Sequence, residues 1–335
     1  GLSGKLTYYF SKIENIVKRA PLSDVSQSLH SRKLALTVYV TNLSFCMFLK
    51  RESALKWTSY LEECYEILVH TEEQKHNNYK KLAIFAKMHS CFEKVYQTLH
   101  RSEFDPFNVN DARSRYIITD LYNSLLQVKR QIPEDDHCFL MYYYSIEAYL
   151  FEPSLHRVLL SDNNVGKTAK PNSADKDKDD SADSKNNNQI QFSTHMIAAI
   201  GNCANSCIKG IMCYKKLTYE QVASLPLIAQ TRIFYICGML IRLRYLSLMG
   251  PKFSELAILP DTLLTNIHDF LEINYNVSKS YPYNYILPKS RIVLILALQT
   301  YLTQVKETLQ NKYNITSDNI NDFDNQKPYE PEINE

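Results

Sequence analysis

One apolar stretch decides the fold class of this sequence, and it reads Leu225-Pro226-Leu227-Ile228-Ala229-Gln230-Thr231-Arg232-Ile233-Phe234-Tyr235-Ile236-Cys237-Gly238-Met239-Leu240-Ile241-Arg242-Leu243-Arg244. Apolar residues continue to Met249, and Gly250-Pro251 follows directly. Proline is favoured in the first turn of a helix, and glycine followed by proline ends one. The stretch therefore predicts a core-like helix that begins at Leu225-Pro226 and ends at Met249.

The rest of the chain repeats this helical character. Apolar residues recur at intervals of three and four, which predicts helices over about residues 6–17, 34–49, 57–68, 79–99, 110–128, 192–216, 261–278 and 290–310. The 7 Gly and 12 Pro residues among 335 are too few for the many short turns of a β-sandwich or barrel. We therefore predict an all-α fold, a single large helical domain of about ten or more helices.

Polar residues mark where several helices begin. Asn110 is a plausible cap for one helix, and Thr218-Tyr219-Glu220-Gln221 has the pattern of a capping box. Pro133 precedes three consecutive carboxylates, at Glu134, Asp135 and Asp136. Carboxylates are favoured at the electropositive start of a helix, so this cluster predicts a helix start rather than a pair of catalytic acids.

The middle of the chain changes character between Ser161 and Gln189. Asn, Asp, Lys and Ser fill this segment, which has no apolar residues to bury and is predicted to be a disordered loop. The predicted organisation is therefore a first half of the helical domain at 1–160, the loop at 161–189, the second half at 190–312 and a polar tail at 313–335.

Charge and composition exclude several classes of partner. The formal charge of +2 creates no field that would attract nucleic acid or an anionic membrane. The longest apolar run, Ile292 to Leu298, is too short to cross a bilayer, and no signal peptide opens the chain. Seven of the eight cysteines lie in apolar helical stretches, as reduced thiols do. We expect an intracellular chain that binds neither DNA nor membranes.

Motifs for catalysis, cofactors and metals are incomplete in this sequence. Val165-Gly166-Lys167-Thr168 resembles the end of a phosphate-binding loop, but Ser161 stands where such a loop needs glycine. Cys203, Cys207 and Cys213, with His195 upstream, have no zinc-site spacing, and we expect packed core thiols. No nucleophile with a partnered base is recognisable. We therefore assign no catalytic residue, no metal and no cofactor.

Aromatic residues cluster at Tyr142, Tyr143 and Tyr144. Such a cluster can stack on nucleic-acid bases, but phosphate-binding lysines and arginines are missing from the neighbouring sequence. The prediction is that these tyrosines belong to an aromatic core.

Three arginines interrupt the apolar stretch, at Arg232, Arg242 and Arg244. A buried arginine needs a carboxylate, a phosphate or several carbonyls. The simpler expectation is that these arginines are exposed or pair with acids of neighbouring helices. The alternative is that one of them binds an anionic small molecule.

The stretch also carries a resemblance to a known family. Pro226 and the core Thr231-Arg232-Ile233-Phe234-Tyr235 resemble the late segment of the regulatory, or middle homology, region of fungal binuclear zinc-cluster transcription factors, in the branch of leucine-biosynthesis and weak-acid-resistance regulators. The likeness spans roughly residues 28–250. Two departures leave the branch open: no aromatic pair follows Arg32, and Leu49-Lys50-Arg51-Glu52 replaces a common Gly-Arg-Pro turn.

The resemblance implies a non-catalytic regulatory domain, either effector-sensing or autoinhibitory, separated from the zinc cluster that binds DNA. It also implies a nuclear, or cytoplasmic and nuclear, location, a small-molecule effector, and homodimer formation through regions outside this chain. The alternative from another class is a helical scaffold or adaptor.

Within the resembling segment, Arg232, Tyr235 and Met239 share nearly one helical face, which makes them the candidate ligand-binding residues. Arg242 and Arg244 approach the helix C-terminus, where cations are favoured, and are expected to be structural or solvated.

Overall fold

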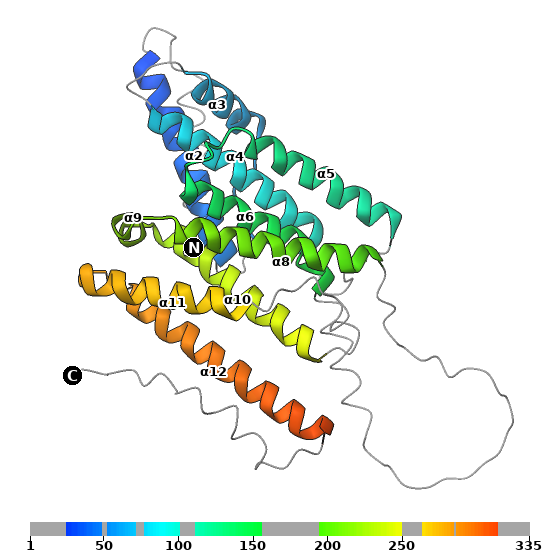
Figure 1. Cartoon of the computed structure of the whole chain (residues 1–335). Coiled ribbons are helices and arrows are strands. Elements are labelled where there is room, and N and C mark those ends of the chain that lie inside the picture. The colour runs from blue at the N-terminus through cyan, green and yellow to red at the C-terminus, as the bar shows by residue number, and fades with distance from the viewer. Residues whose placement is uncertain are drawn as a thin grey trace, which may run out of the picture. The chain divides into compact units, whose positions relative to one another are not determined.

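The computed structural model describes residues 25–48, 52–71, 77–100, 111–155, 194–249, 263–284 and 286–313 (Figure 1). The elements there are α2 (Val25–Phe48), α3 (Ser59–Val69), α4 (Asn77–Val95), the π-helical turn η2 (Tyr96–His100), α5 (Ala112–Lys129), α6 (His137–Phe151), α8 (Thr194–Lys215), α9 (Tyr219–Ser224), α10 (Leu227–Met249), α11 (Leu263–Ser280) and α12 (Ile286–Tyr313). Every regular element in these ranges is a helix, which confirms the all-α prediction.

The chain divides into two compact units. Unit 1 contains residues 1–218 and 224–236, and unit 2 contains residues 219–223 and 237–335. The division thus runs through α10. The predicted loop at 161–189, and all of the predicted polar tail except Tyr313, lie outside the described residues.

The core of unit 1 has two neighbouring parts. In the first, α2, α3 and α4 enclose apolar side chains such as Leu36, Leu61 and Leu68, none of which is solvent-exposed. In the second, α4, α5 and α6 pack around Phe92, Leu125 and Tyr143 and their neighbours. The buried tyrosines confirm that Tyr142 and Tyr143 belong to an aromatic core.

Side chains that cap helices explain two of the helix starts. Asp136 caps α6, because its Oδ1 accepts a hydrogen bond from the backbone N–H of Phe139 at 3.3 Å. Asp111 caps α5 in the same way, through the N–H of Ser114 at 3.1 Å. The carboxylates near α6 therefore stabilise a helix start, as predicted, and α6 begins after Asp136 rather than at Pro133.

Helix α8 is a long apolar helix. Its length and composition would suit a membrane span, yet 61% of its apolar window is buried inside the fold, as in a core helix. It packs along α6, where the Cys203 thiol donates to the carbonyl of Ala148 at 3.5 Å. Burial raises the pKa of the Cys213 thiol. A hydrogen bond with Cys207, and then burial, raise the pKa of the Cys203 thiol.

Unit 2 is organised around α11 and α12, which lie side by side (Figure 1). Ile267, Phe270 and Val277 of α11 are buried, as are Leu287, Leu294 and Tyr301 of α12. The side chain of Asn284 donates to the carbonyl of Ala223 at 2.7 Å, which joins α9 to the turn between α11 and α12.

Two helical glycines should respond to substitution in opposite directions. A Cβ at Gly238 would meet no atom within 4 Å, whereas one at Gly210 would lie 2.5 Å from Ile236 Cδ1. We expect Gly238→Ala to raise the free energy of unfolding by about 0.5–1 kcal/mol, because glycine is a poor helix former. Gly210→Leu should lower it by about 1–3 kcal/mol through overpacking. Urea unfolding measures both, and a stabilised Gly210→Leu variant would contradict the packing described here.

Candidate functional site

Arg232 of α10 is a buried cation that lies on aromatic rings. Its side chain is 8% exposed, and its guanidinium carbon lies 4.3 Å from the ring centre of Phe92 and 6.0 Å from that of Tyr142. Its buried Nε atom has no hydrogen-bond partner. Among the described residues, no carboxylate lies within ion-pair distance of this arginine. Arg232 is therefore neither exposed nor paired with an acid among the described residues, so the simpler expectation is wrong for this arginine.

The surroundings of Arg232 form an aromatic cluster. The ring of Tyr149 meets Phe92 edge-on with ring centres 5.0 Å apart, and meets Tyr235 edge-on at 5.8 Å. His100, at the end of η2, stacks on Tyr149 with the ring centres 3.8 Å apart. Burial is the main cause that raises the pKa of Tyr149, while the charge of Arg232 lowers it. Ring faces attract a cation, so this cluster holds the arginine without neutralising it.

The second predicted residue, Tyr235, also reaches this cluster. Its hydroxyl donates a hydrogen bond of 2.8 Å to Oε2 of Glu152, a carboxylate that is 5% exposed. Burial, and then the charge of Glu152, raise the pKa of Tyr235. The carboxylate of Glu152 thus accepts a hydrogen bond from a tyrosine hydroxyl.

The third predicted residue, Met239, lies beyond the division between the two units. It is buried, and its sulfur accepts from Nη1 of Arg242 at 4.0 Å. Arg242 is exposed, as predicted. The structure therefore brings Arg232 and Tyr235 to one aromatic cluster in unit 1 and places Met239 in unit 2.

Tyr142 belongs to a hydrogen-bonded network that the sequence did not reveal. Nε2 of His89 lies 2.8 Å from both Ser44 Oγ and Tyr142 Oη, and Nδ1 faces the carbonyl of Phe85 at 2.9 Å. Nδ1 therefore carries the proton, and Nε2 is the acceptor. Burial, together with the charge of Arg232, lowers the pKa of His89 to about 3, so the ring is neutral.

This network has the composition of a catalytic pair but not its setting. A serine beside an imidazole is the arrangement of a nucleophile and its base. Ser44, His89 and Tyr142 are all buried, and the hydroxyls of Ser44 and Tyr142 both lie within hydrogen-bond distance of Nε2, which is the arrangement of a structural network. The network instead fixes the ring of Tyr142 beside Arg232.

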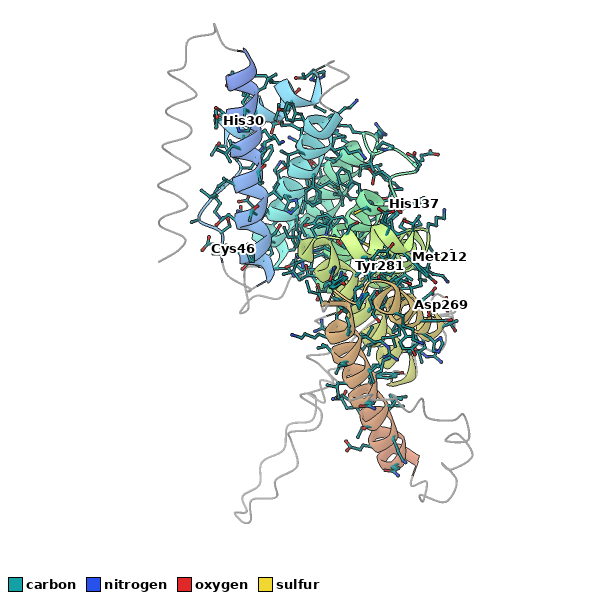
Figure 2. The ribbon with its side chains drawn as sticks, turned by 90° about the vertical axis from the view of Figure 1, so that its left-hand side faces the viewer. His30, Cys46, His137, Met212, Asp269 and Tyr281 are labelled. Carbon is teal, nitrogen blue, oxygen red and sulfur yellow. The ribbon has the colours of Figure 1, made fainter. Side chains whose placement is uncertain are left out.

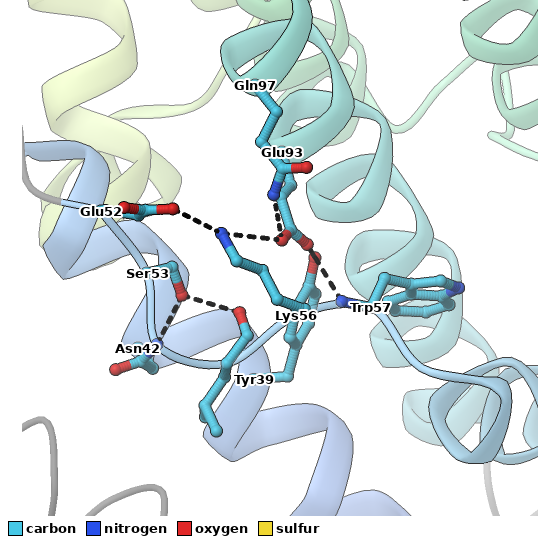
Figure 3. A network of polar contacts seen from close by, with 9 residues as sticks. Tyr39, Asn42, Glu52, Ser53, Lys56, Trp57, Glu93 and Gln97 are labelled. Carbon is cyan, nitrogen blue, oxygen red and sulfur yellow. Dashed lines mark hydrogen bonds and ion pairs between the residues drawn. The ribbon is translucent and has the colours of Figure 1, made fainter. Parts of the chain in front are cut away.

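The buried carboxylate of Glu93, on α4 with His89, has several hydrogen-bond partners. Glu93, 3% exposed, accepts hydrogen bonds from Tyr39 at 2.7 Å, from the backbone N–H of Trp57 at 3.1 Å and from Gln97 at 2.7 Å (Figure 3). Lys56 adds an ion pair at 3.8 Å. Glu147 is likewise bonded, by Ser206 at 2.9 Å and by Tyr143 at 3.3 Å. Both buried acids thus have hydrogen-bond donors, whereas the guanidinium of Arg232 has no acidic partner among the described residues.

Two further motifs of the sequence concern metal binding and phosphate binding. Among the described residues, no three His, Cys, Asp or Glu side chains are grouped to hold a metal ion. The phosphate-loop-like segment Val165-Gly166-Lys167-Thr168 lies outside the described residues.

Comparison with known proteins supplies the family. The sequence matches the WAR1 C-terminal domain family over residues 1–333. It is similar to the transcriptional regulator WAR1 of Candida albicans, with 32% identity over 94% of this chain and 30% of the relative. It is also similar to weak acid resistance protein 1 of Saccharomyces cerevisiae, with 25% identity over 84% of this chain and 29% of the relative.

The matches cover most of this chain and a smaller part of each relative. No solved structure matches the chain significantly. The chain spans about a third of the length of each relative, so it corresponds to one region of a longer regulator. Because the family match covers nearly every residue, the chain belongs to the WAR1 C-terminal domain family.

Proposed function

We propose that this chain is a non-catalytic regulatory domain of a fungal transcriptional regulator, and that it senses an anionic effector through Arg232. The printed names of its relatives describe a transcriptional regulator and a weak acid resistance protein. The observation that carries the effector proposal is the buried guanidinium of Arg232, which has no carboxylate partner among the described residues. In this role the domain acts in the nucleus, within a larger protein that supplies the contacts to DNA.

The physical argument rests on the cost of a buried charge. Removing an ion from water costs several kcal/mol unless a partner compensates for it. The rings of Phe92 and Tyr142 compensate in part, because a cation over an aromatic face gains about 0.5–2 kcal/mol. A bound carboxylate would complete the compensation, since a guanidinium and a carboxylate form two parallel hydrogen bonds.

The surroundings favour one kind of carboxylate. Aromatic rings flank Arg232 on the sides that the structure describes, so an apolar body attached to the carboxylate would meet apolar surfaces. Monocarboxylic weak acids such as benzoate and hexanoate have this composition, in keeping with the name of the yeast relative. The proposed effector is therefore the anion of an apolar weak acid.

A thermal-shift titration tests this proposal. A ligand at one hundred times its Kd raises the stability of the native state by about 2.7 kcal/mol. We expect benzoate or hexanoate to raise the Tm of the wild-type chain by about 5 °C or more. Arg232→Met should abolish the shift, whereas Arg242→Met, which removes an exposed arginine from the same helix, should retain it.

The unliganded variants separate a binding role from a structural one. Arg232→Met should remain folded without ligand, because replacing an unpaired buried charge by an apolar side chain costs little. If this variant unfolds on its own, Arg232 holds the core and the effector site must lie elsewhere. A wild-type chain that shows no shift with either acid would favour the scaffold or adaptor function.

A further inference from the structure

A second set of cations lies at the surface of unit 1, away from Arg232. The ammonium groups of Lys129 and Lys209 lie 5.0 Å and 5.8 Å from the ring centre of Tyr144. Lys129 also lies 5.3 Å from the ring centre of Tyr143. The lysines come from α5 and α8 and the ring from α6, so three helices bring two positive charges to one aromatic side chain. These lysines lie 15 or more residues from Tyr144 in sequence, so the local pattern around that tyrosine does not indicate them.

The outer face of α8 extends this arrangement. Lys209 and Met212 are three residues apart in α8 and so lie on one side of the helix, Lys216 directly follows the last residue of α8, and all three are exposed. Met212 is 45% exposed and points outward from α8 (Figure 2). Burial raises the pKa of the Cys213 thiol, and the positive charges of Lys216 and Lys129 both lower it against this larger effect. We call Lys129, Tyr144, Lys209, Met212 and Lys216 the basic face.

The lysines of the basic face lack acidic partners. Elsewhere in unit 1, Lys81 pairs with Asp136 at 2.9 Å, and Lys87 pairs with Glu62 at 2.5 Å. Within the part of the chain that the structure describes, no carboxylate lies within 4.0 Å of Lys129, Lys209 or Lys216. Two positive charges thus lie over the ring of Tyr144 and a third follows the end of α8, and among the described residues none of the three has an acidic partner.

We propose that the basic face binds an acidic peptide segment of a partner protein. Carboxylates of the segment would meet the three lysines, and an apolar side chain between them would pack on Met212 and Tyr144. Methionine suits this contact because its flexible thioether adapts to different side chains. Nucleic acid fits less well, because its binding depends on neutralising many phosphates and the whole chain has a net charge of only +2. This proposal does not depend on the Arg232 site.

Fluorescence polarisation with a defined probe tests the proposal. The probe is a short fluorescein-labelled peptide of alternating aspartate and leucine, and the control peptide has asparagine in place of aspartate. The combined variant Lys129→Gln, Lys209→Gln and Lys216→Gln should bind the probe about tenfold or more weakly, because three exposed ion pairs are lost. Met212→Gln should weaken binding several-fold at unchanged charge.

A second triple variant controls for net charge. Lys33→Gln, Lys80→Gln and Lys94→Gln remove the same charge from other parts of unit 1 and should leave probe affinity within about twofold. Equal weakening by both triple variants, or equal binding of the asparagine peptide, would overturn the proposal. Tighter binding of a single-stranded oligonucleotide at the same lysines would also overturn it, in favour of a nucleic-acid surface. Arg232→Met should bind the probe normally, which separates this surface from the effector site.

Discussion

Replacing Glu93 by alanine is expected to lower the free energy of unfolding by about 2–6 kcal/mol, because one buried and one half-buried donor lose their acceptor at about 1–3 kcal/mol each. These donors are the hydroxyl of Tyr39 and the backbone N–H of Trp57 (Figure 3). They come from α2 and from the segment before α3, whereas Glu93 belongs to α4. The carboxylate therefore joins three parts of unit 1, and its loss should loosen all of them together.

The measurement can follow the unfolding of unit 1 directly. Trp57 is the single tryptophan of the chain, so its fluorescence during urea unfolding reports on the neighbourhood of Glu93. The Tm should fall by about 10 °C. Glu66→Ala is the matched control, because Glu66 is 55% exposed and forms only a surface pair with His70. A Glu93→Ala variant as stable as this control would show that the buried bonds contribute nothing net.

The helices themselves could be predicted closely from the sequence. The apolar stretch predicted a helix from Leu225-Pro226 to Met249, and α10 runs from Leu227 to Met249. The capping box predicted a helix start at Thr218, and α9 begins at Tyr219. In both places a local signal in the sequence, a proline or a capping-box pattern, predicts where the helix begins. Periodicity and capping depend on residues that are close in sequence, so a single sequence is enough to predict these helices.

Departures occurred where neighbouring helices decide the local structure. Residues 79–99 were predicted as one α-helix, but the structure changes to a π-helical turn at Tyr96. That turn brings His100 onto the ring of Tyr149, a contact between residues 49 positions apart. No spacing within the segment indicates such a contact, so the π turn could not be anticipated from periodicity.

The candidate site shows the same limit. Arginine in an apolar helix identified Arg232 as unusual, and its helical face identified Tyr235. Helical spacing also suggested Met239, because a helix wheel ignores where one compact unit ends and the next begins. The ring of Phe92 and the neutral His89, both of α4, are brought to Arg232 by tertiary packing alone.

The neutral state of His89 leads to a pH dependence whose sign can be worked out. In the unfolded chain its pKa is 6.5, and in the folded chain burial and the charge of Arg232 lower it to about 3. Below about pH 6.5 the unfolded state therefore binds a proton that the folded state refuses, and stability falls as the pH falls. The loss is about 1.4 kcal/mol for each pH unit until the folded pKa near 3 is reached.

Urea unfolding at pH 7.5 and pH 5.5 measures this dependence while most carboxylates stay ionised. The wild-type chain should lose about 1.4 kcal/mol more than His89→Gln over this interval, because the variant has no imidazole to protonate. The comparison uses the difference between two pH values, so any baseline destabilisation of the variant cancels. His70→Gln, which removes an exposed histidine, should retain the wild-type loss. Equal pH dependence in the His89→Gln and wild-type chains would mean that His89 has an ordinary pKa in the folded protein, and would contradict the burial of its ring that lowers this pKa.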